Sequence, residues 1–518
     1  MTSPASRAAR FQVSTPPMDF ESNYEIARTA KFLLSRNFTR VALQFPDELL
    51  KDSTRVVRAL RDQLRSLRKC GAEQNGGNKD VRLFVMADTT YGSCCVDEVG
   101  ALHVNAECVV HYGHTCLSPT TTLPAFFVIG KAAVSVPNCI ESLSSYALIN
   151  DKRILVLYGL EYAYSIKHIR EALVEASKLS ESKSKLEVCF ADVSCSVMNS
   201  SDDHRSSTGL VEPAGVCTDD NAYGMAPDNR YKIGGLVWTL PKGHKMEDYL
   251  LFWIGSDNPE FAIVVLTFNG CDIVRYNPKE NRLVTDVSQQ KRILKRRYYL
   301  VEKAKDANIV GILVGTLGVA GYLHMIHQMK DLITGAGKKV YTLVVGRPNP
   351  AKLANFPECD VFIYVSCAQT ALLDSNEYLA PVITPFEAML AFNRGSQWTG
   401  AFVMEFRDLI NSSLVEVKES EEARFSFLSG GYVEDVDLQG KENDKEDKGT
   451  LALANAMEKV LQLRDNPNSL KKSTARSGPE YFAARSYQGL DMHYDNSLPE
   501  PYLIGRSGRA SGYDDEKK

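Results

Sequence analysis

Hydrophobic segments of strand length alternate with helical segments in three successive rounds, and this recurrence most constrains the fold of the chain. The rounds begin at Arg40, Arg153 and Ile309, so their starts lie about 110 and 155 residues apart. Strands that alternate with helices predict parallel sheets covered by helices. We therefore predict an α/β protein with three related α/β domains in a pseudo-threefold arrangement around a shared centre.

Each round is expected to supply several short strands, and Pro46 ends the first of them. The expected strands lie near 40–45, 81–88, 107–113 and 124–130 in round one, 153–159, 185–192, 261–270 and 281–288 in round two, and 309–314, 338–346, 359–367 and 381–384 in round three. Residues 199–232 are rich in Ser, Asp and Gly and are expected to form a flexible insertion.

These patterns divide the chain into five parts. We place a tail at 1–24, domain 1 at 25–145, domain 2 at 146–295, domain 3 at 296–410, and a C-terminal extension with a charged linker and a disordered tail at 411–518.

Composition narrows the class of protein. The 518 residues carry a formal net charge of only -4, so no large basic field points to nucleic acid. No apolar run approaches the roughly 18 residues that would span a bilayer, and no secretory leader is evident. The first residues lack acids, as transit peptides do, but their prolines favour a disordered tail. We therefore expect a soluble, cytoplasmic protein without a membrane partner.

Several cysteines follow expected strands, at the edge where parallel sheets bind ligands. Cys94 and Cys95 follow the second strand of round one, Cys116 follows its third, and Cys367 follows the third strand of round three. If the three domains face one another, these loops converge. Thiolates without disulfide partners suit an iron–sulfur cluster or another soft metal. Scattered structural cysteines are the competing interpretation.

Zinc is a second interpretation of the same stretch. His111, His114 and Cys116 with Cys95 would supply the four nitrogen and sulfur ligands that zinc prefers. Adjacent cysteines are awkward for a compact zinc site.

Other features are expected to be structural. Gly315, Gly318 and Gly321 do not match a nucleotide-binding loop and predict a tight, closely packed turn. Cys271 follows the expected third strand of round two, where it would be a ligand or, more simply, a loop or core thiol. The remaining cysteines are expected to be structural: Cys70, Cys108, Cys139, Cys189, Cys195, Cys217 and Cys359.

Several long segments resemble the diphthamide synthase family. They are VALQFPDELL, ADTTYGSCCVDEVGA, HYGHTCLSP, GILVGTLGVAGYL, VGRPNPAKLANFPECDVFIYVSCAQTALLDS and PVITPFEAMLAF, and they extend from about residue 25 to 400. The resemblance implies three α/β domains around a central 4Fe–4S cluster. It also implies a reaction, in which the 3-amino-3-carboxypropyl group of S-adenosylmethionine is transferred as a radical to a histidine of translation elongation factor 2.

The resemblance also implies ligands and partners. Cys94 or Cys95, Cys116 and Cys367 match the cluster-binding positions, whereas the cysteine expected in domain 2 is missing at Gly235 to Trp238. This departure favours an accessory redox subunit that keeps the catalytic cluster of a paralogous subunit 1 reduced, with S-adenosylmethionine bound by that partner. A small electron-donor metalloprotein and an NADH-dependent reductase complete the implied system. A non-catalytic scaffold with a structural cluster or zinc is the alternative.

Overall fold

The computed structural model describes the chain from residue 19 onward with gaps. The described residues are 19–70, 80–87, 89–149, 152–179, 187–199, 216–217, 229–373, 377–393, 396, 398, 400, 402–411, 424–426, 428, 430–433, 508–509 and 512–513. The chain divides into two units, Met1–Ala484 and Arg485–Lys518. In the second unit, β21 (Gly508–Arg509) and β22 (Gly512–Tyr513) form an antiparallel pair.

The first sheet has the order β2-β1-β3-β4-β8-β9, and its first four strands are parallel. Its central strand β3 is buried along its whole length, as expected for a strand covered on both faces. The elements of this part of the chain are α1 (Phe20–Asn23), α2 (Ile26–Ser35), β1 (Arg40–Gln44), α3 (Asp47–Leu50), α4 (Ser53–Cys70), β2 (Arg82–Met86), α5 (Glu98–His103), β3 (Cys108–Gly113), β4 (Ala125–Ile129), α6 (Val136–Ile149), β8 (Val197–Met198) and β9 (Val216–Cys217).

The second sheet has the order β14-β13-β12-β5-β6, with β14 antiparallel at one edge. A small antiparallel sheet, β10-β11-β7, accompanies it. The elements are β5 (Arg153–Tyr158), the 3-10 turn η2 (Leu160–Tyr162), α7 (Ala163–Leu179), β6 (Val188–Phe190), β7 (Asp192–Val193), β10 (Arg230–Ile233), β11 (Leu236–Thr239), η3 (Met246–Asp248), β12 (Tyr249–Ile254), α8 (Pro259–Thr267), β13 (Asp272–Asn277), β14 (Arg282–Val284) and α9 (Val287–Lys305).

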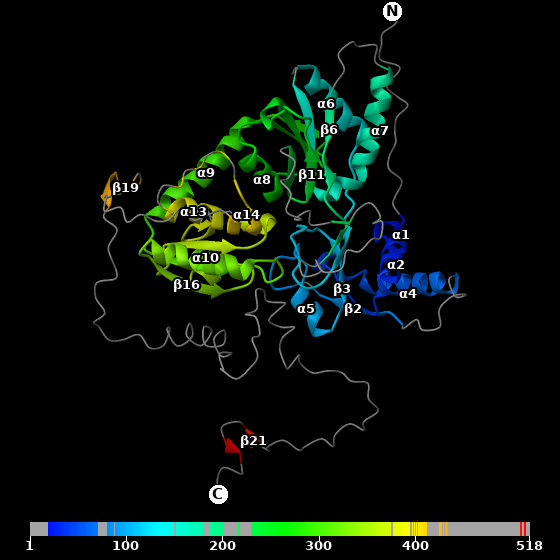
Figure 1. Cartoon of the computed structure of the whole chain (residues 1–518), viewed down its shortest axis with the longest axis horizontal. Helices are drawn as coiled ribbons and strands as arrows, with labels where there is room; N and C mark the ends of the chain where they lie inside the picture. Colours follow the sequence, from blue (N-terminus) through cyan, green and yellow to red (C-terminus); the bar gives the residue numbers. More distant parts are fainter. Residues whose placement is uncertain are drawn as a thin grey trace, which may run out of the picture. The chain divides into compact units, whose positions relative to one another are not determined.

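The third sheet is entirely parallel and has the order β16-β15-β17-β18. Helices α9 and α13 lie side by side next to it (Figure 1). The elements are β15 (Ile309–Val314), α10 (Tyr322–Gly335), β16 (Lys339–Val344), α11 (Pro350–Leu353), β17 (Val361–Val365), α12 (Ala368–Ala371), β18 (Val382–Ile383), α13 (Pro385–Phe392), α14 (Phe406–Asn411) and the hairpin β19 (Arg424–Ser426) and β20 (Gly431–Val433).

The three main sheets share one strand order. In each, the first strand lies between the second and the third, and the fourth follows the third. The prediction of an α/β protein with several parallel sheets is therefore confirmed. The domain boundaries and the pseudo-threefold arrangement stay predictions.

Two predicted strands of round two are wrong. Residues 261–267 lie in α8 and 268–270 form a turn, because Pro259 begins this helix and the side chain of Asn258 caps it by accepting a hydrogen bond from the Phe261 N–H (3.0 Å). The third strand is instead β12, which precedes this helix. Both segments are buried apolar runs, which periodicity alone cannot assign to a strand or a helix. Of residues 281–288, only Arg282–Val284 form a strand, and that strand is antiparallel to β13.

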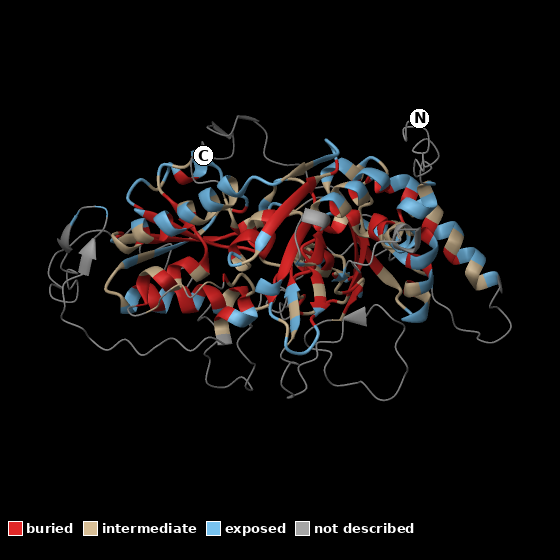
Figure 2. Ribbon diagram, turned by 90° about the horizontal axis from the view of Figure 1, so that it is seen from above, coloured by how far each residue is buried: buried red, intermediate tan, exposed pale blue. Residues whose placement is uncertain are grey.

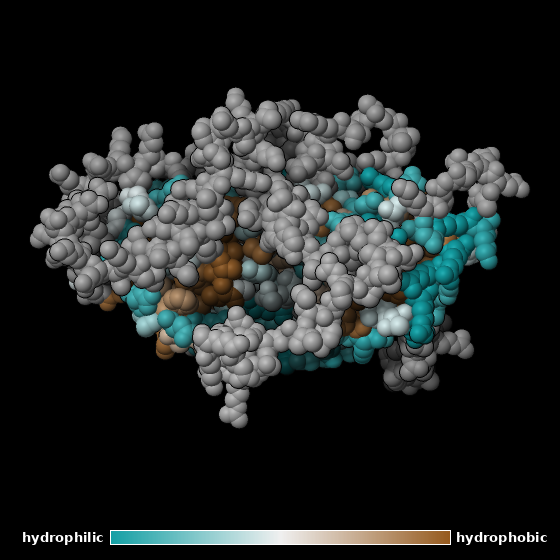
Figure 3. Space-filling model, turned by 90° about the horizontal axis from the view of Figure 1, so that it is seen from below, coloured by the Kyte–Doolittle hydropathy of each residue, from teal (hydrophilic) through white to brown (hydrophobic). Residues whose placement is uncertain are grey.

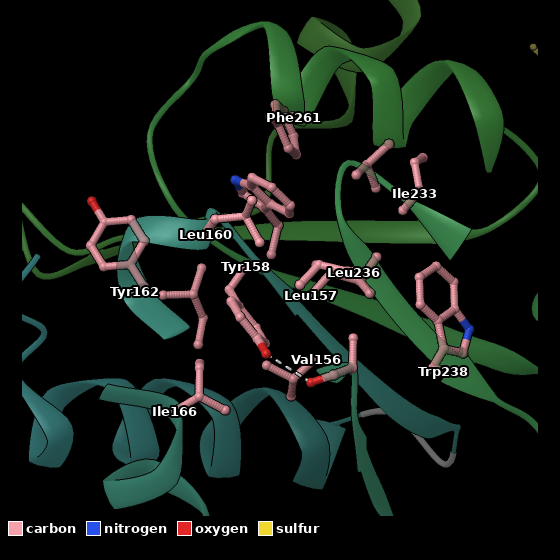
Figure 4. Close-up of a cluster of buried hydrophobic side chains, with 14 of the residues drawn as sticks. Val156, Leu157, Tyr158, Leu160, Tyr162, Ile166, Ile233, Leu236, Trp238 and Phe261 are labelled. Atoms are coloured by element: carbon pink, nitrogen blue, oxygen red, sulfur yellow. Dashed lines mark hydrogen bonds between the residues drawn. The ribbon is translucent and has the colours of Figure 1, made fainter. Parts of the chain in front are cut away.

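The predicted insertion at 199–232 is mostly outside the described residues. Its end differs from the prediction, because Arg230–Ile233 form β10 and pair with β11. Figure 4 shows how Ile233, Leu236 and Trp238 of this hairpin lie beside Val156 and Leu157 of β5. The Tyr158 hydroxyl donates a hydrogen bond to the carbonyl oxygen of Ala191 (2.9 Å) in the same core.

The buried residues follow the strands, while the exposed ones lie mainly on the outer faces of the helices (Figure 2). On the face in Figure 3, hydrophilic side chains border an exposed hydrophobic area. Among the described residues, no helix combines the length and apolar character that crossing a membrane requires.

Candidate metal centre

Four thiols that are remote in sequence meet inside the molecule. The Sγ atoms of Cys94, Cys95, Cys116 and Cys367 all lie within 4.8 Å of one another, and all four residues are buried. Cys94 Sγ is 3.4 Å from Cys367 Sγ, and Cys116 Sγ is 3.8 Å from Cys95 Sγ. We call these four residues the four-thiol site.

The topology explains why the thiols meet. Cys94 and Cys95 lie in the loop between β2 and α5, Cys116 lies beyond the end of β3, and Cys367 follows β17 at the residue directly before α12. Each cysteine therefore stands at the carboxyl end of a parallel strand, as the sequence predicted. The backbone N–H of Cys116 donates to the carbonyl of Cys94 (3.1 Å), which joins the two loops of the first sheet.

The side chain of Gln44 fixes the position of the Cys94–Cys95 loop. This buried side chain ends β1, and its Nε2 donates to the carbonyl oxygen of Cys95 (2.9 Å). Its Oε1 accepts from the backbone N–H of Asp97 (2.9 Å). The side-chain amide of Gln44 therefore pairs with the carbonyl oxygen of the residue before Val96 and with the N–H of the residue after it. These two hydrogen bonds fix the position of the loop.

Glu98 performs a similar function for the chain beyond Cys116. Its fully buried carboxylate accepts hydrogen bonds from three consecutive backbone N–H groups, those of Thr121 (2.9 Å), Thr122 (2.7 Å) and Leu123 (2.8 Å). Because charge-assisted bonds of this kind are strong, Glu98 ties α5 firmly to the 117–123 loop.

The third sheet approaches the site through hydroxyl groups and a close backbone contact. The Thr316 hydroxyl is 3.8 Å from Cys95 Sγ, and the Thr370 hydroxyl is 3.1 Å from Cys367 Sγ. A Cβ on Gly318 would lie only 2.1 Å from the carbonyl oxygen of Val96. This contact agrees with the predicted closely packed turn at Gly315, Gly318 and Gly321.

The thiols differ in acidity. Hydrogen bonds from the thiols of Cys116, Cys94 and Cys95 hold the pKa of Cys367 well below its usual value, and the Thr370 hydroxyl adds to this effect. The pKa values of Cys94 and Cys95 are raised, first by the hydrogen bond with Cys116 and then by that with Cys367. Metal binding would therefore release the protons of Cys94 and Cys95.

The donor set fits a soft metal. Buried thiols without another kind of donor suit zinc or an iron–sulfur cluster. With Zn–S bonds of about 2.3 Å, a tetrahedral ion needs sulfur atoms about 3.8 Å apart. The separation of 3.8 Å between Cys116 and Cys95 matches that spacing, and the 3.4 Å between Cys94 and Cys367 is slightly shorter. A four-iron cluster is larger, so these sulfur atoms would have to move apart to hold it.

The two histidines of the zinc interpretation do not join the thiols. His111 is buried with its Nε2 3.1 Å from the carbonyl oxygen of Ser93, so it supports the cysteine loop from within β3. His114 lies beside Glu260, with Nε2 to Oε1 at 3.7 Å. Among the described residues, the metal-capable groups are the four thiols and a separate group of His114, Glu161 and Glu260.

Cys271 does not occupy the predicted position. It precedes β13 instead of following a third strand, and its thiol donates to the carbonyl oxygen of Met246 (3.3 Å). Cys108, Cys139 and Cys359 are buried free thiols outside the site, and Cys189 is half-buried. The side chains of Cys70 and Cys217 lie outside the described residues.

The segment Gly235 to Trp238, where the domain 2 cysteine was expected, lies close to the site without a thiol. Gly235 has a positive φ of 82°, and a Cβ there would lie 2.8 Å from Leu117 Cδ1, directly after Cys116. Leu236 and Trp238 are buried in the core. The second sheet instead provides Glu161 and Glu260, which had not been predicted because no local pattern distinguishes them.

Comparisons with known proteins point to one family along nearly the whole chain. A family model described as "Putative diphthamide synthesis protein" matches residues 45–403. Proteins named 2-(3-amino-3-carboxypropyl)histidine synthase subunit 2 are similar: that of Danio rerio is 33% identical and that of Xenopus laevis 34%. These matches cover 97% of this chain and 93% and 94% of the relatives.

A solved structure, described as Dph2 from Pyrococcus horikoshii with a 4Fe-4S cluster, has 18% sequence identity and a TM-score of 0.49, covering 73% of this chain and 94% of that one. The family model spans well over half of the chain, and relatives above 30% identity cover almost all of it. The chain belongs to the diphthamide synthesis protein family.

Proposed function

We propose that this chain is the accessory, electron-carrying subunit of an iron–sulfur enzyme that transfers a 3-amino-3-carboxypropyl group from S-adenosylmethionine to a histidine of translation elongation factor 2. The names of the relatives, which describe a subunit of a synthase of that modified histidine, support the reaction. The paralogous subunit 1 carries the catalytic cluster and binds S-adenosylmethionine. A small electron-donor metalloprotein and an NADH-dependent reductase deliver the electrons, in the cytoplasm.

The observation that carries the accessory role is where the thiols of the site come from. Cys94 or Cys95, Cys116 and Cys367 would hold a 4Fe–4S cluster, which supplies one-electron transfer when bound. None of these thiols comes from the second sheet, where Gly235 to Trp238 stand in place of the expected cysteine. A cluster held by two loops of the first sheet and one loop of the third has a different open face from one held by all three domains, and this favours an electron-carrying role.

The chain's own residues would tune and protect that centre. The hydroxyls of Thr316 and Thr370 lie near Cys95 and Cys367, and hydrogen bonds to the sulfur ligands change the reduction potential of a cluster. Burial of all four thiols excludes water from the metal. Gln44 and Glu98 fix the two loops, so that the ligands change little when the charge of the centre changes.

Anaerobic purification of the chain with subunit 1 tests the proposal. The chain alone should be brown, contain about four iron and four sulfide per molecule and be bleached by dithionite. Alone it should not modify elongation factor 2, whereas the pair should. Transfer by the reduced chain alone at the rate of the pair would overturn the accessory role.

A scaffold subunit with a zinc ion is the second candidate function. The sulfur separation of 3.8 Å between Cys116 and Cys95 equals the spacing around a single tetrahedral ion, and the 3.4 Å between Cys94 and Cys367 is nearer to that spacing than to the wider one of a four-iron cluster. Zinc has no redox chemistry, so such a centre would only stabilise the fold and the pairing with subunit 1. A colourless protein with one zinc and no iron, still required for activity of the pair, would support this candidate.

A further inference from the structure

A second group of metal-capable side chains lies next to the four-thiol site. Donor atoms of His114, Glu161 and Glu260 lie within 4.8 Å of one another. His114 follows β3, Glu161 lies in η2 after β5, and Glu260 lies in the first turn of α8 after β12. Figure 4 labels Leu160 and Tyr162, which flank Glu161, and Phe261, which follows Glu260. The group therefore joins the carboxyl ends of strands from two sheets.

The two carboxylates have no lysine or arginine partner among the described residues. Glu260 is only 7% exposed, and an Oε2 atom of Glu161 is fully buried with no hydrogen-bond partner. Within the part of the chain that the structure describes, no Lys or Arg forms an ion pair with either of them. A buried carboxylate and a half-buried one at this distance favour a shared proton or a cation, because their charges repel and water reaches Glu260 and the Oε2 atom of Glu161 poorly.

The third side chain, that of His114, favours a cation over a shared proton. His114 adds a nitrogen donor on the same side, and its side chain is 52% exposed, which gives the group access to solvent. One imidazole and two carboxylates are a donor set used for zinc and manganese. Donors about 2.0–2.2 Å from one ion stand no more than about 4.4 Å apart, so a contraction on the order of 1 Å closes the group.

We propose that His114, Glu161 and Glu260 form a binding site for a first-row divalent cation, distinct from the four-thiol site. Its oxygen and nitrogen donors select a harder ion than the thiols do. With three protein ligands, the ion keeps an open position for water or an external ligand. This site is independent of which metal the thiols hold.

One amide connects the two sites. Gln369 Nε2 donates to Glu260 Oε1 (2.8 Å) and to the carbonyl oxygen of Thr115 (3.1 Å). Thr115 directly precedes Cys116, and Gln369 follows Cys367 by two residues. A cation at Glu260 therefore stabilises the two loops that carry Cys116 and Cys367. Removal of the cation should make the four-thiol site lose its metal more easily.

Manganese binding to the full chain, with its four-thiol centre loaded and protected from oxygen, tests the site. Mn²⁺ is a suitable probe because thiolates select softer metals. Electron paramagnetic resonance should detect about one bound Mn²⁺, and Glu161→Gln, Glu260→Gln and His114→Ala should each weaken binding by more than about tenfold. The exposed Glu175→Gln is the control and should bind normally.

Iron, sulfide and zinc analysis of the same samples separates the two sites. Variants that keep the thiol-bound metal but lose Mn²⁺ support the proposal. If Glu260→Gln misfolds, the Mn²⁺ binding of His114→Ala tests the proposal, because the half-exposed His114 can be replaced without disturbing the core. The proposal is overturned if the wild-type chain binds no Mn²⁺ at millimolar concentration, or if all three variants bind it as the wild type does.

Discussion

The Sγ atoms of Cys94 and Cys367 lie 3.4 Å apart although 273 residues separate them in the chain. Cys116→Ser and Cys367→Ser should therefore each lose most of the metal of the four-thiol site, because each removes one of its expected ligands. Metal analysis and the visible spectrum of the purified variants measure the loss. Cys108→Ser and Cys359→Ser, at buried cysteines outside the site, are the matched controls. Full metal content in both ligand variants would show that these thiols are not ligands.

Glu98→Gln should destabilise the loop after Cys116. The substitution replaces a carboxylate that accepts three backbone N–H groups, and each hydrogen bond to a charged group contributes about 1.5–3 kcal/mol. We expect the free energy of unfolding to fall by at least about 3 kcal/mol and the metal to be lost faster to a chelator. Unfolding in urea and the rate of metal release measure the two effects. An unchanged release rate would contradict the role of Glu98 at the site.

Gly318→Ala should disturb the four-thiol site from the third sheet. The added methyl group would meet the carbonyl oxygen of Val96 at 2.1 Å, and this backbone cannot move without moving Cys95. We expect reduced metal retention. Gly335→Ala in α10, where no atom lies within 4 Å of the new Cβ, should leave retention unchanged. Equal retention in the two variants would mean that the loop adapts freely.

The pair of Arg297 and Glu387 should be among the most sensitive points of the fold. Arg297 Nε donates to Glu387 Oε1 (2.6 Å), and their side chains are 6% and 1% exposed. Glu387→Ala leaves a buried guanidinium without its partner, which costs about 3–5 kcal/mol. The exposed pair of Lys152 and Asp272 is the comparison, and Asp272→Ala should cost much less. Urea unfolding of both variants decides this prediction.

Glu107 should make stability depend on pH. Burial raises the pKa of its carboxyl, but the backbone N–H groups of Thr39 and Arg40, the Thr39 hydroxyl and the Arg40 charge outweigh burial and lower the pKa from 4.5. A lowered folded pKa adds stability above the unfolded pKa, and this contribution is lost as pH falls through the folded pKa. The wild type should therefore exceed Glu107→Gln in stability at pH 7, with the difference shrinking below about pH 4.5. A constant difference across pH would refute this account.

Much of the fold could be predicted because the strands of rounds one and three are short apolar runs bounded by turns. The convergence of Cys94, Cys95, Cys116 and Cys367 followed from one rule, that parallel sheets present loops at the carboxyl ends of their strands. In round two, the prediction of the third strand was wrong. The segments that form β12 and α8 are both buried and apolar and follow each other, and neither has a polar face that would distinguish a strand from a helix. The shift of Cys271 is a consequence of that error.

The supporting residues could not be predicted from sequence. Gln44, Glu98 and Gln369 act through hydrogen bonds to backbone groups 23 to 254 residues away, and only the folded chain brings these partners together. No local pattern marks such a residue. The carboxylates of Glu161 and Glu260 were missed for the same reason, since each is an ordinary acid near a helix or turn start.

The position of Cys367 also has a consequence for the order of events during synthesis. It is translated 251 residues after Cys116. At about 5–20 residues per second, three of the four thiols exist for roughly 13–50 s before the fourth is made. The growing chain therefore carries an incomplete soft-metal site, open to wrong ions and to oxidation, until the third sheet has left the ribosome. A full complement of metal can be installed only after that, so delivery of the metal has to wait for the nearly finished chain.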